Sequence, residues 1–310
     1  MRLSLSPQHA EAILGAMRDV AETGSDLTDH DRVCLVAAGR WMLGLPQVDI
    51  QTLPSYTPGA LALALTGSGL GEEATRLLAV MPFVDGVLDK KKIARVEEHA
   101  RALGVREGYL DELTQVLHDD ATDALAHMVR DNMESILGKP FSGDVMAWML
   151  PYRGAGADPI LAGRFRALTA KPEGSFGRAF INFYTRNGYG VPGETSALNA
   201  RFCLPHDSSH IFAGYDTTPR GELLVSTFTA GMHPRHPLSA QILPVIFSWH
   251  LGIKINDVAK SATGALDPAE FWHAWERGQS MKIDIFGPDW DFWNWVDRPL
   301  EELRQTYLAQ

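Results

Sequence analysis

The amino-acid sequence predicts an all-α protein. Through the first 140 residues, apolar side chains recur at spacings of three and four, the period of a helix that buries one face. Ser, Thr or Asp followed by proline, a signal for the start of a helix, stands before several helical runs along the chain. No run shows the strict apolar–polar alternation of a half-buried strand. We therefore expect helices throughout the chain and no sheet.

The helices of the N-terminal part follow from this period and from their end signals. The pattern predicts helices that begin at Pro7 and at Asp29, after Ser6 and Thr28, and helices over 72–84, 91–103, 107–117 and 125–137. Gly138-Lys139-Pro140 ends the last of these, because glycine terminates helices and proline cannot continue them.

The second half of the chain differs in composition. Six of the eight tryptophans follow residue 200. Asp267-Pro268 opens a further helix there, as a cap followed by proline in the first turn. We place a domain boundary at the helix stop near Pro140 and predict two helical domains, 1–140 and 141–310.

Charge and cysteine usage exclude several classes of function. Lys and Arg number 28 and Asp and Glu 38, a net charge of −10, which disfavours binding to nucleic acid. The two cysteines, Cys34 and Cys203, lie far apart and indicate neither a disulfide framework nor a cysteine zinc site. No apolar run reaches the ~20 residues of a transmembrane helix. These features predict a soluble cytoplasmic protein, and they are compatible with peripheral membrane association and with a homo-oligomer.

One short segment has the residues and the spacing of a metal-binding site. His206-Asp207-Ser208-Ser209-His210 places two imidazoles four residues apart, on one face of a helix, where both can reach one ion. The alternative is a pair of solvated histidines on a surface helix. Asp207 lies about 100° around the helix from His206, so we expect it to be a distorted ligand or to orient one.

A carboxylate follows at a distance that suits the same ion. Gly214 can end the first helix, and Thr218-Pro219 can start the next. Glu222 then lies in the first turn of the second helix, within reach of a metal held by the first. Two imidazoles and one or two carboxylates suit zinc, with iron, manganese and cobalt as alternatives. The zinc-protease motif fits poorly, because it needs Glu directly after the first His.

The segments around these residues resemble the fourth coenzyme Q (ubiquinone) biosynthesis protein family. The motif His-Asp-x-x-His, eleven residues, then Glu is similar to the signature of that family and covers His206, Asp207, His210 and Glu222. Three further stretches within residues 145–310 are similar to segments of the family: Pro172–Phe180, Gly214–Thr217 and Asp297–Arg304. Ser208-Ser209 depart from it, standing where the family commonly carries apolar or aromatic residues.

The resemblance implies a function. It implies a helical domain with a bound divalent metal, and oxidative decarboxylation at ring carbon C1 of a polyprenylated hydroxybenzoate precursor, a reaction of lyase or oxidoreductase type. The metal ligands would be His206, His210 and Glu222, with Asp207 as a ligand or an orienting group. Leu238–Leu251 would supply an apolar groove for the isoprenoid tail. Other quinone-biosynthesis proteins would be partners, at the inner membrane.

Two other readings stay open. In the first, the protein is a non-catalytic scaffold or lipid-presenting member of the quinone biosynthetic complex. In the second, it is a metal-dependent tailoring enzyme for another aromatic or polyketide-like acid. An open coordination position separates an enzyme from a scaffold, because structural metal sites are closed.

One further residue and two further segments are candidates for function. Arg178 is a candidate for a substrate carboxylate, with a surface ion pair as the alternative. The stretch from His118 to His127 is rich in Asp and His, but we expect a solvated helix face. The N-terminal part, residues 1–140, resembles the TerB-type helical domain of the tellurite-resistance proteins through Phe83–Asp89 and the helix after it, and the resemblance implies that acidic residues could hold a metal there. Three lysines follow, so we expect Asp85 and Asp89 to be turn and cap residues.

Overall fold

The computed structural model describes residues 5–117, 121–254 and 261–308. It is 62% helical, about twice the share of an average soluble protein, which confirms the all-α prediction. The β-type pairings of the described residues are two isolated bridges, Ser175 with Pro299 and Leu251 with Thr263. No helix in the described ranges combines the length and the apolar character needed to cross a bilayer.

Most predicted N-terminal helices are present with the predicted caps. The α-helices before residue 140 are α1 (Pro7–Ala21), α2 (Asp29–Trp41), α3 (Pro58–Ala64), α4 (Gly71–Leu78), α5 (Lys90–Leu103), α6 (Gly108–Leu117) and α7 (Ala121–Leu137). The Thr28 hydroxyl caps α2 by accepting from the Asp31 N–H at 3.0 Å. The prediction of one helix over 72–84 is wrong, because α4 ends at Leu78 and a 3₁₀ turn with Pro82 follows.

The second half continues with helices joined by longer connections. These helices are α8 (Val145–Met149), α9 (Pro159–Arg166), α10 (Phe176–Asn187), α11 (Ala200–Ala213), α12 (Pro219–Met232), α13 (Leu243–Val245), α14 (Pro268–Gln279) and α15 (Leu300–Tyr307). Asp267 caps α14, as predicted, by accepting from the Ala269 N–H at 2.9 Å. Pro237–Ile242 and Ile246–His250 form π-helical turns on either side of α13.

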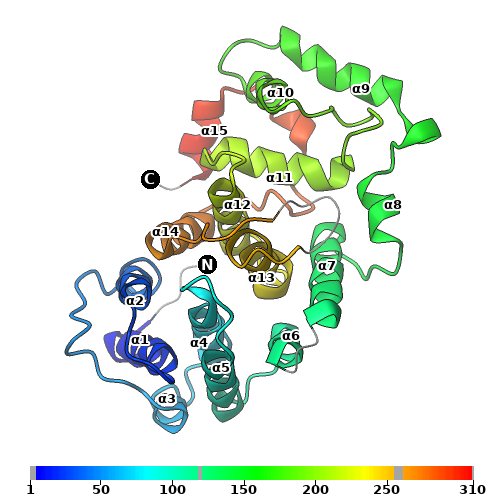
Figure 1. The fold of residues 1–310 in the computed structure, drawn as a ribbon. Helices are drawn as coiled ribbons and strands as arrows, with labels where there is room; N and C mark the ends of the chain where they lie inside the picture. Colours follow the sequence, from blue (N-terminus) through cyan, green and yellow to red (C-terminus); the bar gives the residue numbers. More distant parts are fainter. Residues whose placement is uncertain (1–4, 118–120, 255–260, 309–310) are drawn as a thin grey trace.

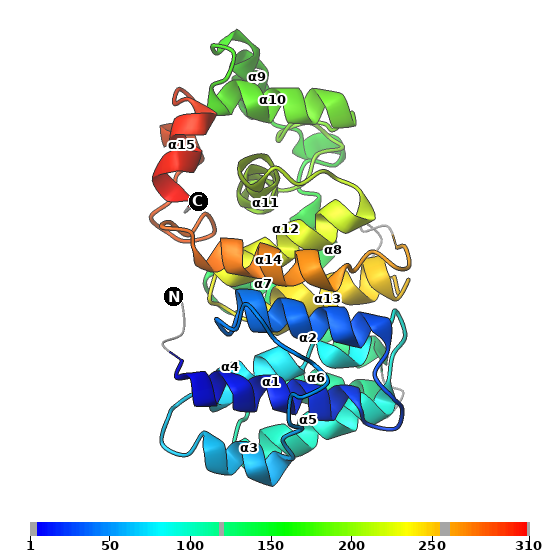
Figure 2. The ribbon, with the colours of Figure 1, turned by 90° about the vertical axis from the view of Figure 1, so that its left-hand side faces the viewer.

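The helices stack along the long axis of the molecule (Figures 1 and 2). Helices α1 to α6 form one end, and α9, α10 and α15 form the other. Between them lie α12, α13 and α14, with α7 beside α13 in Figure 1 and α11 next to α12 in both views. Helix α14 packs on α2 and also on α12. The middle of the molecule is therefore built mainly from the second half of the sequence.

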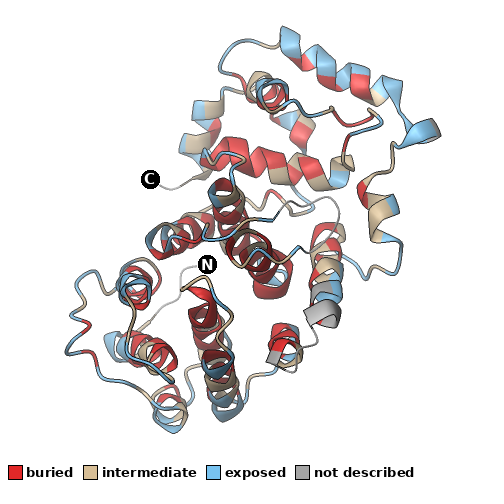
Figure 3. Cartoon of the chain, in the orientation of Figure 1, coloured by how far each residue is buried: buried red, intermediate tan, exposed pale blue. Residues whose placement is uncertain are grey.

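The largest buried cluster joins both halves of the chain. It runs from Ala10 in α1 to Trp275 in α14 and includes Phe247 beside α13. A second cluster, from Ala162 to Leu303, fills the other end. Burial is accordingly densest along the middle helices in Figure 3. Separate folding of residues 1–140 stays a prediction, but helices from both sides of Pro140 share one core.

The middle helices approach unusually closely. Gly231 on α12 and Gly278 on α14 face each other, and a Cβ on either would collide with backbone of the opposite helix. Two glycines at the crossing therefore let α14 support α12, the helix that carries Glu222.

Candidate metal centre

The local sequence brings α11 and α12 together at the predicted site. Helix α11 ends at Gly214, whose φ of +81° is left-handed. Thr218 then caps α12, with its hydroxyl accepting from the Gly221 N–H at 3.2 Å. A Cβ on Gly221 would collide with Asp216, so glycine lets the first turn of α12 lie against the connection. Glu222 is thereby held beside α11, as the sequence predicts.

Helix α11 contains a proline directly before His206. Pro205, inside the helix and directly before His206, has no N–H to give to the preceding turn. Its own carbonyl accepts from the Ser209 hydroxyl at 2.8 Å. The helix continues past the proline, so His206 and His210 stay one turn apart on the same face.

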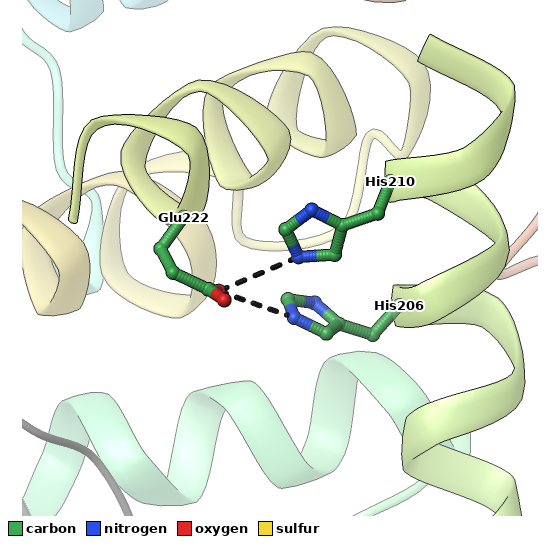
Figure 4. Close-up of side chains that lie close together, drawn as sticks. All are labelled: His206, His210 and Glu222. Carbon is green, nitrogen blue, oxygen red and sulfur yellow. Dashed lines mark ion pairs between the residues drawn. The ribbon is translucent and has the colours of Figure 1, made fainter. Parts of the chain in front are cut away.

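Three side chains converge at the spacing of metal ligands (Figure 4). The Nε2 atoms of His206 and His210 lie 3.4 and 3.5 Å from Oε2 of Glu222. All three ligand atoms lie within 4.8 Å of one another. Bonds of about 2.1 Å to a tetrahedral zinc ion place donor atoms about 3.4 Å apart. The residues present therefore fit a divalent ion bound by two imidazoles and one carboxylate.

Hydrogen bonding prepares His210 for this role. Its Nδ1 faces the Tyr215 carbonyl at 3.3 Å and donates to it, which leaves the lone pair on Nε2. Nε2 is buried and has no hydrogen-bond partner. A buried ring nitrogen without a partner is costly unless something binds it. A metal ion would satisfy this atom.

The charges of the group are consistent with a cation site. Burial raises the pKa of Glu222, but the two histidines outweigh it and hold the pKa well below its usual range. Burial likewise lowers the pKa of His206, but the Glu222 carboxylate outweighs it and raises the pKa. Glu222 is thus an anion at neutral pH and can serve as a ligand without losing a proton.

Asp207 points to a different partner. Its Oδ2 accepts from the Tyr184 hydroxyl of α10 at 2.5 Å, and it is not one of the three converging ligands. Burial raises the pKa of Asp207 and also that of Tyr184. Their hydrogen bond joins α10 to α11 next to His206. Sequence reasoning missed Tyr184, because nothing in the α10 pattern distinguishes it from a core residue.

An apolar cavity adjoins the three ligands. It measures about 440 Å³, and His206, His210, Glu222 and Asp207 lie in its wall. Ala240, Val245 and Trp249 also line it, so part of the apolar stretch Leu238–Leu251 does form a wall beside the site. Among the described residues, no Lys or Arg lines this cavity. Its size is at the lower end of small-molecule pockets, about 300–1,000 Å³.

The remaining sequence candidates lie elsewhere. Arg178 donates to the Thr169 carbonyl and pairs with Glu173 at 2.9 Å, and it does not line the cavity. The surface ion pair considered as its alternative is therefore present. Residues 118–120 lie outside the described ranges, and His127 is exposed.

The acidic residues of the TerB-like segment have partners of their own. The Asp89 carboxylate caps α5, accepting from Lys91 N–H at 2.9 Å, as predicted. Asp85 does more than shape a turn, because its Oδ2 lies 3.2 Å from Nζ of Lys92.

No protein-family model, no curated protein and no solved structure matches this chain. The resemblance to the ubiquinone biosynthesis family therefore rests on the motif residues alone.

Proposed function

We propose that this protein is a metal-dependent enzyme that acts on an aromatic acid with an apolar substituent, of the kind used in ubiquinone biosynthesis. One observation supports it above the others: the His206, His210 and Glu222 ligand atoms converge in the wall of an apolar cavity of about 440 Å³. Catalytic zinc sites have three protein ligands and an open position, whereas structural sites have four. Three ligands beside a cavity match the catalytic pattern.

Different residues of the site would bind the metal, orient its ligands and exclude water. His206, His210 and Glu222 would hold the ion, which would act as a Lewis acid or redox centre toward a bound carboxylate or phenol. The Tyr215 carbonyl orients His210. The Tyr184 hydroxyl donates a hydrogen bond to Asp207 in the wall of the cavity and so fixes the position of that carboxylate. The apolar wall excludes water from the ring.

The resemblance supplies the specific reaction in this proposal. It implies oxidative decarboxylation at C1 of a polyprenylated hydroxybenzoate, in which the carboxyl group leaves as CO2 and a two-electron oxidant from outside the protein takes up the electrons, with other quinone-biosynthesis proteins as partners. The cavity favours a compact ligand, because about 440 Å³ holds a ring and a short apolar substituent inside the protein. A longer isoprenoid tail has to leave through the mouth of the cavity.

The same cavity supports the second candidate, a scaffold that presents a lipid without chemistry. A Glu222→Gln variant separates the two, because it keeps the shape of the side chain and removes the charge that a metal needs. Glu301→Gln is a matched control, since Glu301 is exposed on α15, far from the cavity lining.

The experiment is complementation of a strain that lacks the native gene, with quinone precursors identified by mass spectrometry. An enzyme predicts that Glu222→Gln accumulates an intermediate that retains its carboxyl group, whereas Glu301→Gln restores normal quinone. Normal quinone from a folded, metal-depleted Glu222→Gln protein would reject catalysis and favour the scaffold. Accumulation of a different aromatic acid would point to a tailoring enzyme.

A further inference from the structure

The wall of the cavity includes a helix from the N-terminal part of the chain. Met128, Val129, Asn132 and Met133 of α7 line the same cavity as the three metal ligands. In Figure 4 the helix that passes below His206 and Glu222 is α7, in the colour that it has in Figure 1. This helix lies before residue 145, outside the stretch that resembles the ubiquinone biosynthesis family. The ligand site is therefore larger than the motif region.

Hydrogen bonds fasten α7 to another wall of the cavity. Asn132 Nδ2 donates to the Ala240 carbonyl at 2.7 Å, and the Ser239 hydroxyl donates to Asp131 at 2.5 Å. Ser135 donates to the carbonyl of Arg235 at 3.2 Å. All three bonds join α7 to residues 235–240, at the π-helical turn before α13. Helix α7 is thus a fixed wall.

Apolar packing holds the C-terminal half of α7 in place as well. Met133 is 1% exposed and belongs to a small buried cluster with Ile136 of α7 and Met149 of α8. Phe202, which stacks on the ring of His206 at 5.2 Å, packs against this cluster. The apolar contacts of α7 therefore extend to the side chain next to a metal ligand.

We propose that α7 sets the size of the apolar group that the site accepts, with Met128, Val129 and Met133 in contact with it. The proposal rests on the proposed function, because it concerns the ligand of the same cavity. Flexible methionines and a small valine leave room that larger side chains would fill. The N-terminal part of the chain is then a specificity element for the site in the C-terminal part.

Val129→Trp tests this with little risk to folding, because Val129 is only half-buried. Arg130→Trp is the matched control: the neighbouring residue of the same helix, exposed and absent from the cavity wall. Both variants are prepared as full-length, zinc-loaded protein. Binding is measured for two probes, 1-aminoanthracene by fluorescence and 3-geranyl-4-hydroxybenzoate by calorimetry, and zinc content is measured alongside.

We expect Val129→Trp to weaken both probes at least about tenfold, while Arg130→Trp binds them like wild type. Zinc content should be the same in all three proteins, because no metal ligand changes. Wild-type-like binding by folded Val129→Trp overturns the proposal, and so does a wild-type protein that binds neither probe. If wild type binds 1-aminoanthracene but not the aromatic acid, and Val129→Trp loses the former, α7 sets the cavity size and the proposed substrate class is wrong.

Discussion

Two groups of charged and titratable side chains in the described part of the chain lie wholly or partly buried, and their charges are balanced in different ways. In the N-terminal ion cluster, Nζ of Lys92 lies 2.8 Å from Asp31 and 3.2 Å from Asp85. In the metal group, Glu222 faces only the two imidazoles of His206 and His210. The first group has a lysine ammonium of the chain as its cation, whereas the second sets two imidazoles against one carboxylate.

The difference separates an ion cluster that supplies its own cation from a group that could hold a metal ion. Lys92 and Asp31 are 2% and 0% exposed, and the ammonium takes the position between carboxylates that a metal ion would need. Burial lowers the pKa of Lys92, but Asp31 and Asp85 outweigh it and raise the pKa, so the ammonium stays charged. The metal group leaves His210 Nε2 without a hydrogen-bond partner, 3.5 Å from Glu222 Oε2, and lies in the wall of a cavity. Buried acids thus indicate metal binding only where the chain supplies no cation.

The largest expected effect comes from removing the built-in cation. Lys92→Met leaves the buried Asp31 and the half-buried Asp85 without their ammonium partner, so we expect the free energy of unfolding to fall by about 3–5 kcal/mol. Urea denaturation measures it, and Lys91→Met, at an exposed neighbour in the same helix, serves as the control. A loss below about 1 kcal/mol in Lys92→Met would mean that the cluster is not a structural ion pair.

For the metal group of His206, His210 and Glu222, we expect the stability of the protein to depend on added zinc. Wild type should bind about one zinc ion per chain, and zinc at 100 times its Kd should raise the free energy of unfolding by about 2.7 kcal/mol. His210→Ala should lose both the ion and this stabilisation, whereas His127→Ala, at an exposed histidine, should keep them. Elemental analysis and denaturation with and without chelator provide the measurements. Equally low zinc content in wild type and His210→Ala would show that these residues do not form a zinc site.

At acid pH we expect a smaller change in the free energy of unfolding. It comes from Asp19, an aspartate of the N-terminal half that is paired with His99 and Arg95. Burial raises the pKa of Asp19, but hydrogen bonds and charges from His99 and Arg95 outweigh it and lower the pKa from 3.8 to about 2. The unfolded chain therefore binds more protons than the folded one between these values. The stabilisation is present above about pH 4 and is lost as the pH falls toward 2.

The lowered pKa of Asp19 corresponds to a contribution of about 2 kcal/mol to the free energy of unfolding above about pH 4. Asp19→Asn should show a flatter loss of stability than wild type between pH 4.5 and about 2.5. Asp26→Asn, at an exposed aspartate, should follow the wild-type curve. Parallel curves for wild type and Asp19→Asn would exclude this contribution.

Much of the local structure was readable in the sequence. Thr28, Asp89 and Asp267 were recognisable as helix caps, because a side-chain oxygen satisfies N–H groups only a few residues away. The placement of His206 and His210 on one helix, and of Glu222 in the first turn of the next, follows from the same short-range rules. The error at α4 came from proline inside an apolar run.

Other features depend on residues that are distant in sequence. The bond between Tyr184 and Asp207 spans 23 residues, and that between Asn132 and Ala240 spans 108. Lys92 meets Asp31 across 61 residues. No local sequence pattern predicts such pairs, because each pair depends on how the helices pack against one another and not on how each helix forms.

The sequence alone therefore determined most of the N-terminal helices, several helix caps and the three candidate metal ligands, since hydrogen bonds within a few residues control helix ends and side-chain faces. Only the tertiary structure decided that α7 lines the cavity of the second half, that Lys92 occupies the space between Asp31 and Asp85, and that one core crosses residue 140. The reason is physical. Burial of apolar surface is non-directional, so the same amphipathic helices are compatible with many packings until their side chains interlock.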